Sequence, residues 1–212
     1  MWDKKIIAIS DSQNTQGDFL NFIEKLSQSS INALVLREKH LDELEYTKLA
    51  KEVLKIFNKT QKICFLHYYY ETCLKLNHQF FHAPLFVLQN YPQSYKKIEF
   101  LGTSIHSKEE LDLAYKLKVS HAFFGHVFES SCKADLTPKG IKNLNDLLKV
   151  SKIPIYAIGG INTQTINHLK DLNLAGVCIR EALYKSENVK KYISKCKDLL
   201  VQKRLKDYNQ KK

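Results

Sequence analysis

Residues 121–140, HAFFGHVFESSCKADLTPKG, are the stretch on which the fold assignment depends. An apolar run, Ala122–Phe124, leads through a glycine to His126, and a polar loop follows. Thr137 then precedes Pro138, as in a helix N-cap followed by proline at the first helical position, where the missing N–H costs nothing. The stretch therefore predicts a strand, a loop and a helix, with an imidazole just past the strand end.

The same order of a short apolar run and a longer amphipathic stretch recurs along the chain. Strands are expected at residues 5–10, 32–37, 61–66, 80–82 or 85–88, 98–103, 122–126, 154–158 and 175–179. Eight strands alternating with helices predict an α/β fold, a single (β/α)8 TIM barrel with a basic C-terminal helical tail. An open doubly wound sheet is the alternative, which the lack of a G-x-G-x-x-G motif after the first strand disfavours.

Capping patterns indicate where the helices begin. Asp42 with Glu45, and Ser107 with Glu110, have the spacing of a capping box. Helices are expected at 18–27, from 42, from 107 to 118, at 138–150, after a cap at Asn162 or Thr163, and from 189. The stretch 67–100 is the least regular part, with a turn expected at 90–93.

The net charge of +11 is concentrated at the C-terminal end, where residues 189–212 carry nine Lys or Arg and two Asp. Their apolar residues recur with helical spacing at Val189, Ile193, Cys196, Leu200 and Val201. We therefore expect a barrel at 1–188 and, at 189–212, a basic helix and tail packed on the barrel or trailing from it. A basic tail can bind RNA, but no aromatic platform or RNA-binding module accompanies it, so no nucleic-acid partner is expected.

Length and composition limit the remaining classes. A chain of 212 residues with 44% apolar residues suits one globular domain. No apolar stretch approaches the roughly 20 residues of a membrane span. The N-terminus has too short an apolar run and too early an acid for a signal peptide, so a cytoplasmic protein without a membrane partner is expected. Five cysteines without a C-x-x-C pair favour a reducing compartment and argue against disulfides and zinc, and Cys132 is interpreted as an incidental thiol.

In a barrel, the active residues lie in the loops that follow the strands. The polar candidates on that rule are Arg37 and Lys39, Ser104 and His106, His126, Ser130, Ser131 and Lys133, Gly159 and Gly160, and Arg180. So many cations at one rim predict an anionic ligand. Gly159 and Gly160 stand between a predicted strand and a predicted helix, where backbone N–H groups can bind a phosphate; a tight turn is the alternative explanation of the pair.

His126 is the strongest candidate for proton transfer. An imidazole titrates near neutrality and can both accept and donate a proton at cellular pH. Its place at a strand end, beside a polar loop with Lys133, favours catalysis over a structural role. Other histidines, among them His67, His82 and His121, lack this context and are interpreted as structural.

Arg37 and Lys39 follow an apolar strand and suit a carboxylate or a phosphate, although a solvated pair would have the same pattern. Paired acids at the strand ends are absent, and Asp11 stands alone after the first strand. Because magnesium prefers carboxylate oxygens, we expect no metal and no cofactor.

Five motifs give the chain a resemblance to the thiamine phosphate synthase superfamily, between about Lys5 and about Ser186. They are LREK (36–39), GTSIHS (102–107), FGHVFESSCK (124–133), IPIYAIGGI (153–161) and AGVCI (175–179). The order is that of the superfamily. The match is thin between 65 and 100 and absent from the basic tail.

The superfamily has two branches, and the differences favour one of them. The synthase branch has G-P-I-F-x-T after the sixth strand, Asn-Asp after the third and acids after the fourth, which hold magnesium and a pyrophosphate. This chain has His126 in place of the proline, His67-Tyr68 in place of Asn-Asp, and Ala83–Phe86 in place of the acids. The segment GHVFE instead resembles the thiazole tautomerase branch, whose histidine moves the proton.

The resemblance implies an isomerase that aromatises a thiazole phosphate carboxylate in thiamine biosynthesis. It implies His126 as the general acid/base, and Gly159, Gly160, Ile179 and Arg180 around the phosphate. Arg37, Lys39, Ser104, Ser130 and Lys133 are the further substrate-binding candidates. Arg180-Glu181 departs from the small residues usual in the family, so the phosphate pocket is expected to be tighter or to gain an arginine contact.

Two other functions are kept open by the sequence. One is thiamine phosphate synthase itself, a transferase that condenses a pyrimidine pyrophosphate with the thiazole phosphate. The other is a non-catalytic barrel that binds a phosphorylated ligand. A pocket blocked around Phe86 and Arg180 would favour this function. The expected partner is in each case a small phosphorylated molecule, and a homodimer is one possible assembly.

Overall fold

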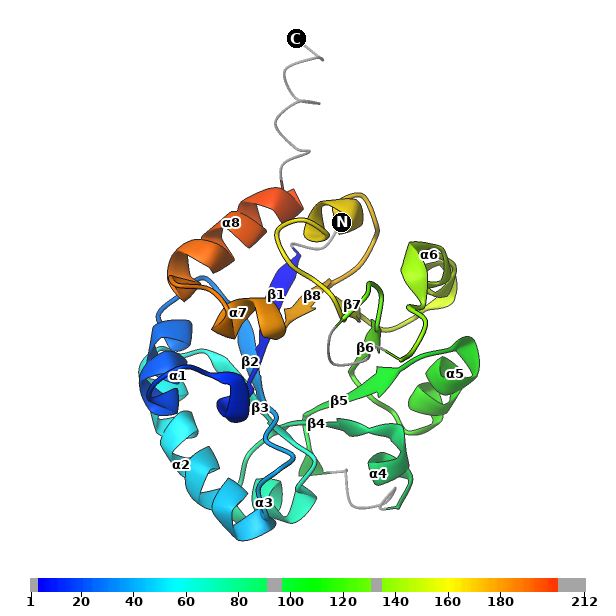
Figure 1. Cartoon of the computed structure of the whole chain (residues 1–212). Helices are drawn as coiled ribbons and strands as arrows, with labels where there is room; N and C mark the ends of the chain where they lie inside the picture. Colours follow the sequence, from blue (N-terminus) through cyan, green and yellow to red (C-terminus); the bar gives the residue numbers. More distant parts are fainter. Residues whose placement is uncertain (1–3, 91–96, 131–134, 202–212) are drawn as a thin grey trace.

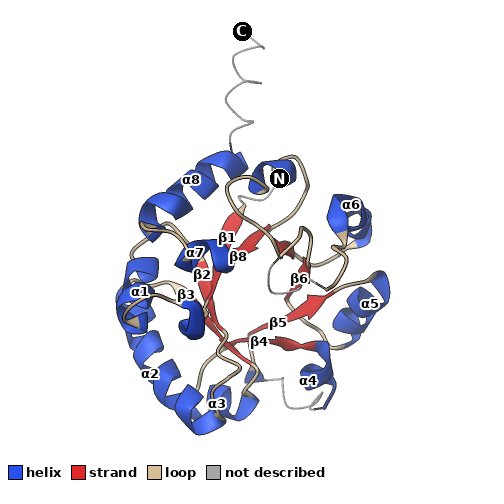
Figure 2. Ribbon diagram, viewed as in Figure 1, coloured by secondary structure: helices blue, strands red, loops and turns tan. Residues whose placement is uncertain are grey.

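A computed structural model of the chain describes residues 4–90, 97–130 and 135–201. Eight parallel strands pair in sequence order, and the last pairs with the first to close the barrel. The strands are β1 (Lys5–Ile9), β2 (Ala33–Leu36), β3 (Ile63–His67), β4 (Phe80–Pro84), β5 (Phe100–Ile105), β6 (His121–Gly125), β7 (Ile155–Ile158) and β8 (Gly176–Ile179). The predicted (β/α)8 barrel is confirmed, and Figure 2 shows the ring of strands inside a layer of helices.

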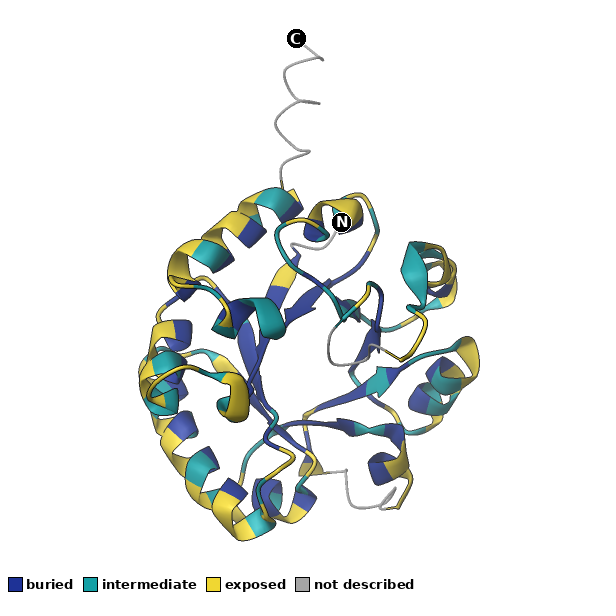
Figure 3. Ribbon diagram, viewed as in Figure 1, coloured by how far each residue is buried: buried dark blue, intermediate teal, exposed yellow. Residues whose placement is uncertain are grey.

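Helices cover the outside of the barrel. They are α1 (Phe19–Ser27), α2 (Glu43–Lys59), α3 (Tyr70–Lys75), α4 (Leu85–Asn90), α5 (Lys108–Lys116), α6 (Gly140–Val150), α7 (Glu181–Tyr184) and α8 (Val189–Val201), with short 3-10 helices at Ser12–Asn14 and Ile166–Leu169. Figure 3 shows that each long helix turns a buried face to the strands and an exposed face to solvent. This division follows from their amphipathic sequences.

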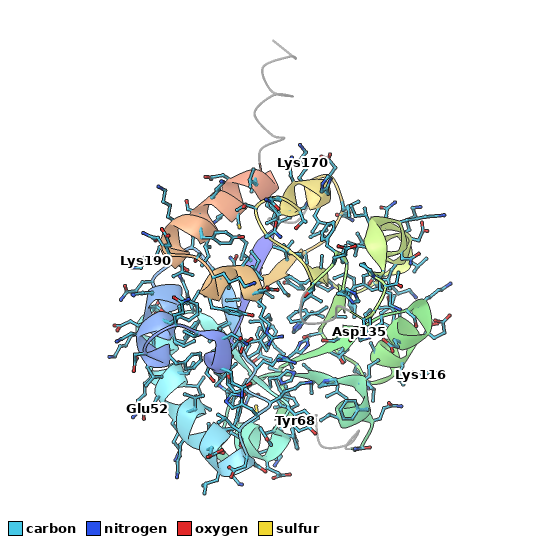
Figure 4. All side chains as sticks on the ribbon, viewed as in Figure 1. Glu52, Tyr68, Lys116, Asp135, Lys170 and Lys190 are labelled. Atoms are coloured by element: carbon cyan, nitrogen blue, oxygen red, sulfur yellow. The ribbon has the colours of Figure 1, made fainter. Side chains whose placement is uncertain are left out.

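Two apolar cores hold the layers together. The larger lies between strands and helices and includes Tyr46, Phe57 and Phe81, none of them exposed. The smaller lies inside the barrel and consists of Ile7, Ile9, Ala33, Val35, Phe65, Phe123 and Cys178. The centre that the ribbons leave open in Figure 1 is therefore occupied by side chains, as Figure 4 shows.

The capping box at Asp42 is present, because Asp42 accepts from the Glu45 N–H while the Glu45 carboxylate accepts from the Asp42 N–H. The one expected at Ser107 is only half formed. Ser107 accepts from the Glu110 N–H, but the Glu110 carboxylate accepts from the backbone N–H of His106.

The least regular stretch holds one wrong prediction. Phe80–His82 lies in β4, as expected, but the second strand candidate, 85–88, belongs to helix α4. β4 already pairs with β3 on one side and β5 on the other, so the barrel has no place for a further strand here. The expected turn at 90–93 begins inside α4 and otherwise lies outside the described residues.

Two helix starts were also predicted wrongly. α6 begins at Gly140 rather than Pro138, because the N–H groups of Lys139 and Gly140 donate to the carbonyls of His126 and Val127 and hold this segment against the loop after β6. After β7 the chain forms only the 3-10 helix Ile166–Leu169. Asn162 does accept from the N–H groups of Gln164 and Thr165, but the turn that it stabilises is not continued into an α-helix.

The last helix begins at Val189 and buries Val189, Ile193, Cys196 and Leu200, four of the five residues of the predicted face; the fifth, Val201, is exposed at the last position of the helix. It lies beside α1 and the 3-10 helix Ile166–Leu169, where the Tyr192 hydroxyl accepts from the Thr163 N–H. The division of the chain at residue 188 stays a prediction. Within the described residues, no helix is long and apolar enough to span a membrane.

Candidate functional site

A cavity of about 1450 Å³ opens at the C-terminal ends of the strands. Eight of the ten predicted site residues line it: Arg37, Lys39, Ser104, His126, Ser130, Gly159, Gly160 and Arg180. Ile179 does not line it, because its fully buried side chain packs in the core between strands and helices. Lys133 lies outside the described residues. The rule that places active residues after barrel strands therefore brings most of the candidates to one site.

The floor of the cavity is apolar over β1, β2 and β6 to β8. Interior residues of the barrel form it: Ile9, Val35, Phe123, Ile158 and Cys178. Burial raises the pKa of the Cys178 thiol well above its usual value, so this cysteine stays protonated and is no nucleophile.

His126 forms part of the cavity wall and is only 5% exposed. Its Nε2 lies 3.0 Å from the carbonyl oxygen of Leu136. A carbonyl can only accept a hydrogen bond, so Nε2 carries the proton, and in the neutral ring Nδ1 is the basic nitrogen. The loop after β6 thus fixes both the orientation of the imidazole and its tautomer.

Gly159 and Gly160 hold β7 against this loop. Both have positive φ, +97° and +66°. A Cβ atom on Gly159 would lie 2.2 Å from Cβ of His126, and one on Gly160 would lie 2.2 Å from the carbonyl oxygen of Glu129. Their lack of side chains is therefore explained first by close packing against the His126 loop, although both residues also line the cavity.

Charged groups gather where β8, β1 and β2 end. Arg180 forms an ion pair of 2.5 Å with Asp11, which also accepts from the side-chain amide of Asn14. Burial alone would raise the pKa of Asp11, but the Asn14 hydrogen bond and the Arg180 charge outweigh it and the pKa is lowered. Asp11 appears isolated in the sequence. It is therefore the ion-pair partner of Arg180, a residue predicted to bind phosphate, which lies 169 positions further along the chain.

Glu38 turns away from the cavity, between Arg37 and Lys39. It is 2% exposed and accepts hydrogen bonds from the hydroxyls of Ser10 and Ser12 at 2.5 and 2.7 Å. The Ser10 hydroxyl in turn accepts from the Arg37 N–H at 2.7 Å. This hydrogen-bond network holds the backbone of Arg37 and Lys39 in place against the end of β1.

His67 and His82 are cavity residues that the sequence analysis treats as structural. Both line the cavity from β3 and β4, and their rings stack with centroids 6.0 Å apart. Burial lowers the pKa of His67 to about 3, and the charges of Arg37 and Lys39 lower it further; burial also lowers the pKa of His82 well below its usual value. Both rings are therefore neutral, and strand alternation, with Phe65 and His67 two apart, could have indicated that they face inward.

Apolar side chains stand at the mouth. Phe86, from helix α4, and Leu136, from the loop after β6, line the cavity and are 57% and 59% exposed. Neither they nor Arg180 fill the space, so the cavity remains open to a ligand of small-molecule size. Among the residues that the structure describes, no three His, Cys, Asp or Glu side chains are placed to hold a metal ion.

The sequence resembles known proteins over most of the barrel. The family model described as "TMP-TENI: Thiamine monophosphate synthase" matches residues 6–183. The Aquifex aeolicus protein named "Putative thiamine-phosphate synthase 2" is 29% identical over 76% of this chain and 88% of its own length. The thiamine-phosphate synthase of Clostridium tetani is 25% identical over 89% of this chain and 92% of its own.

Solved structures share the fold. Thiamine phosphate pyrophosphorylase from Pyrococcus furiosus superimposes with a TM-score of 0.79 at 19% identity, covering 93% of this chain and 96% of its own. The 3-hexulose-6-phosphate synthase of Salmonella typhimurium reaches 0.70 at 14% identity, covering 93% and 99%, so the fold by itself does not select a reaction. The family assignment depends instead on the sequence model, which covers most of the barrel. The chain belongs to the thiamine monophosphate synthase family.

Proposed function

We propose that this protein is a thiazole tautomerase, an isomerase that aromatises a thiazole phosphate carboxylate by a proton shift. The observation that carries the proposal is His126, in the cavity wall with Nε2 committed to the Leu136 carbonyl and Nδ1 as the basic nitrogen of the neutral ring. One proton leaves the thiazole ring and one arrives at an exocyclic carbon. His126 can accept the first and return it at the second.

The cations of the rim support binding of the two anionic groups of this substrate. Arg37 and Lys39 line the cavity near His67, whose pKa their charges lower. They suit the carboxylate, together with Ser104 and Ser130. Arg180, Gly159 and Gly160 line the cavity at the ends of β7 and β8 and suit the phosphate, in line with the usual phosphate site after the last two barrel strands.

The ends of β3 and β4 do not fit the magnesium ion that the synthase branch uses. Their residues are His67-Tyr68 and Ala83–Phe86, none of which has a carboxylate. Asp11 is paired with Arg180. These residues offer nitrogen and aromatic groups where a magnesium site needs oxygen ligands, so we derive no step through a metal.

The second candidate is thiamine phosphate synthase, a transferase. The names of the relatives favour it, since the Clostridium tetani protein and its counterparts in Fusobacterium nucleatum and Methanobrevibacter smithii are all called thiamine-phosphate synthase. This observation concerns the relatives, whereas the His126 loop and the ends of β3 and β4 are features of this chain.

One pair of incubations decides between the two activities. The purified full-length protein is mixed with the unrearranged thiazole phosphate carboxylate, and formation of the aromatic ring is followed by absorbance and NMR. A parallel sample holds the pyrimidine pyrophosphate, thiazole phosphate and magnesium, and is assayed for thiamine phosphate. Aromatisation without condensation supports the proposal, and condensation establishes the synthase. Phosphate affinity without either turnover would identify a binding protein and overturn both.

A further inference from the structure

Three histidines lie inside the barrel on the β3 to β6 side, and two of them, His82 and His121, form a row with Gly102. The strand register places His82 beside Gly102 and Gly102 beside His121, on β4, β5 and β6. His82 is 2% and His121 7% exposed, and their ring centroids are 5.8 Å apart. His82 lines the cavity, while His121 lies at the start of β6, toward the opposite end of the barrel.

Each outer end of this row has a serine. The Ser104 hydroxyl, which lines the cavity, lies 3.1 Å from Nε2 of His82. The Ser120 hydroxyl, which is half-buried at the N-terminal end of β6, lies 3.0 Å from Nδ1 of His121. The row therefore reaches from the cavity to the far face of the barrel.

The inner nitrogens, Nδ1 of His82 and Nε2 of His121, are buried and have no hydrogen-bond partner among the described residues. Both face Gly102: a Cβ atom there would lie 2.5 Å from the first and 2.3 Å from the second. A buried polar atom without a partner destabilises the folded state, so two of them flanking one glycine call for an explanation. The two nitrogens are close enough for a small ring movement or one bridging water to connect them by hydrogen bonds.

Donor and acceptor roles can be assigned along the row. The Ser120 hydroxyl donates to the Leu101 carbonyl at 2.9 Å, so it accepts from His121, which then carries its proton on Nδ1 and has a bare Nε2. A proton on Nδ1 of His82 points at that bare nitrogen and leaves Nε2 of His82 to accept from Ser104. The order of donors is then continuous from the cavity outward.

We propose that Ser104, His82, His121 and Ser120 form a proton path through the barrel, from the cavity floor to the solvent at its opposite end. In the outward direction Ser104 takes a proton from the ligand and gives its own to Nε2 of His82. The Nδ1 proton of His82 passes to Nε2 of His121, the Nδ1 proton of His121 passes to Ser120, and Ser120 releases one to water. Both imidazoles change tautomer and stay neutral, so no buried charge is left behind.

Aromatic rings surround the row. Phe65, Phe123 and Tyr156 all pack against the His121 ring, with centroids 5.0, 5.5 and 5.9 Å away. Phe123 also stacks on His82 at 4.1 Å. The row is therefore enclosed largely by aromatic rings.

The role in catalysis rests on the proposed tautomerase reaction, whereas the path itself does not. In that reaction the path takes the ring proton in place of His126, and His126, entering the cycle with a proton on Nδ1 as well, supplies the exocyclic one. The substrate then loses one proton and gains one. A proton that enters at Ser120 and moves inward restores both imidazoles to Nδ1–H, and the proton that it delivers to the cavity reprotonates His126. A bound substrate that closes the mouth does not block the exit.

The test of the path uses full-length protein with ¹⁵N-labelled histidine and no substrate. Two-bond ¹H–¹⁵N correlation spectra report the tautomer of each ring. We expect Nδ1–H on both His82 and His121, and several-fold slower exchange of the His82 proton with deuterated solvent in Ser120→Ala but not in Ser104→Ala. His82 protonated on Nε2 in the resting protein, or exchange that slows only in Ser104→Ala, would overturn the path.

Kinetics test the catalytic role separately. His121→Phe should lower turnover at saturating thiazole substrate several-fold with KM unchanged, and Ser120→Ala should do the same. His78→Phe is the control for loss of an imidazole outside the row, because the half-buried His78 bonds the Cys64 carbonyl, and it should change neither value. Equal turnover in His121→Phe and wild type would remove the catalytic role. A wild-type protein without tautomerase activity would refute the proposed function, and the spectra would still decide on the path.

Discussion

The two halves of the cavity are built from different chemistry. At the ends of β8, β1 and β2, the charged half, Arg180 is paired with Asp11, and Glu38 is held by two serine hydroxyls. At the ends of β3 to β6, the histidine half, the groups are His67, His82, Ser104 and His126. Fixed charges suit the binding of an anion, and imidazoles suit the movement of a proton. The proposed function therefore assigns the holding of the ligand to the charged half and the chemistry to the histidine half.

The largest effect is expected from His126→Asn, in the histidine half. The variant keeps a side-chain amide near the Leu136 carbonyl but has no basic nitrogen, so aromatisation should slow by about 10²- to 10⁴-fold. Circular dichroism and the unfolding midpoint check that the fold is kept. If Arg180→Met slowed the chemical step as much at saturating substrate, the division of labour between the halves would be wrong.

A smaller effect, on stability, is expected from Arg180→Met in the charged half. It leaves the Asp11 carboxylate buried without its cation, which should cost about 3 kcal/mol in the free energy of unfolding. Asp11→Asn combined with Arg180→Met should recover part of the loss. Denaturant titrations at pH 7 measure all three, and a double variant no more stable than Arg180→Met would show that the pair does not act as a unit.

The same pair predicts a response to acid. The folded pKa of Asp11 lies below its unfolded value, so its contribution to stability is present above the unfolded pKa and is lost as the pH falls through the folded one. Without Arg180 the folded pKa rises. The difference in bound protons between the unfolded and folded states then shrinks, so the loss of stability on acidification should be smaller in Arg180→Met than in the wild type.

Gly159→Ala tests the contact by which β7 supports the histidine half. The positive φ alone costs an alanine about 1–2 kcal/mol, and the new methyl group would also meet His126. Gly17→Ala is the matched control, because Gly17 has φ of +74° but nothing within 4 Å of the added atom. We expect Gly159→Ala to cost at least about 1 kcal/mol more than the control, by overpacking, and to lower activity. Equal losses of stability in both variants would show that the His126 loop moves to accommodate the added methyl group without a cost in free energy.

The sequence predicts the barrel and most of the cavity lining, because both follow from local patterns. Periodicity locates the strands, and each strand end locates a loop residue such as His126. Periodicity does not distinguish the strand at Phe80–His82 from the helix at 85–88, since both are short apolar runs. Only the pairing of β4 with a strand on each side decides which run is the strand. The Asp11–Arg180 pair has no local signal at all. Strand alternation indicates that His67 and His82 point into the barrel. Because they lack polar neighbours in the sequence, they are nevertheless interpreted as structural.

The smallest expected effect is a difference between the two halves in how their contribution to stability depends on pH. The folded pKa values of His67 and His121, about 3 and about 4, lie below the value of about 6.5 in an unfolded chain. The unfolded state therefore binds more protons between these values, and stability is complete above pH 6.5 and falls as the pH is lowered toward 4. Each ring contributes a slope of at most about 1.4 kcal/mol per pH unit. The free energy of unfolding, measured at pH 5, 6 and 7, should fall less steeply in His67→Gln and His121→Gln than in the wild type.

Tyr156→Phe is the control for that series, since Tyr156 packs against His121 and its pKa, raised by burial to about 12, leaves it uncharged throughout the range. Its slope should equal that of the wild type. Because the Asp11 contribution is lost only at still lower pH, mild acid should weaken the histidine half before the charged half. A wild-type slope retained by both histidine variants would mean that these rings are not held neutral by the fold, and the contrast between the halves would then lie in position rather than in charge.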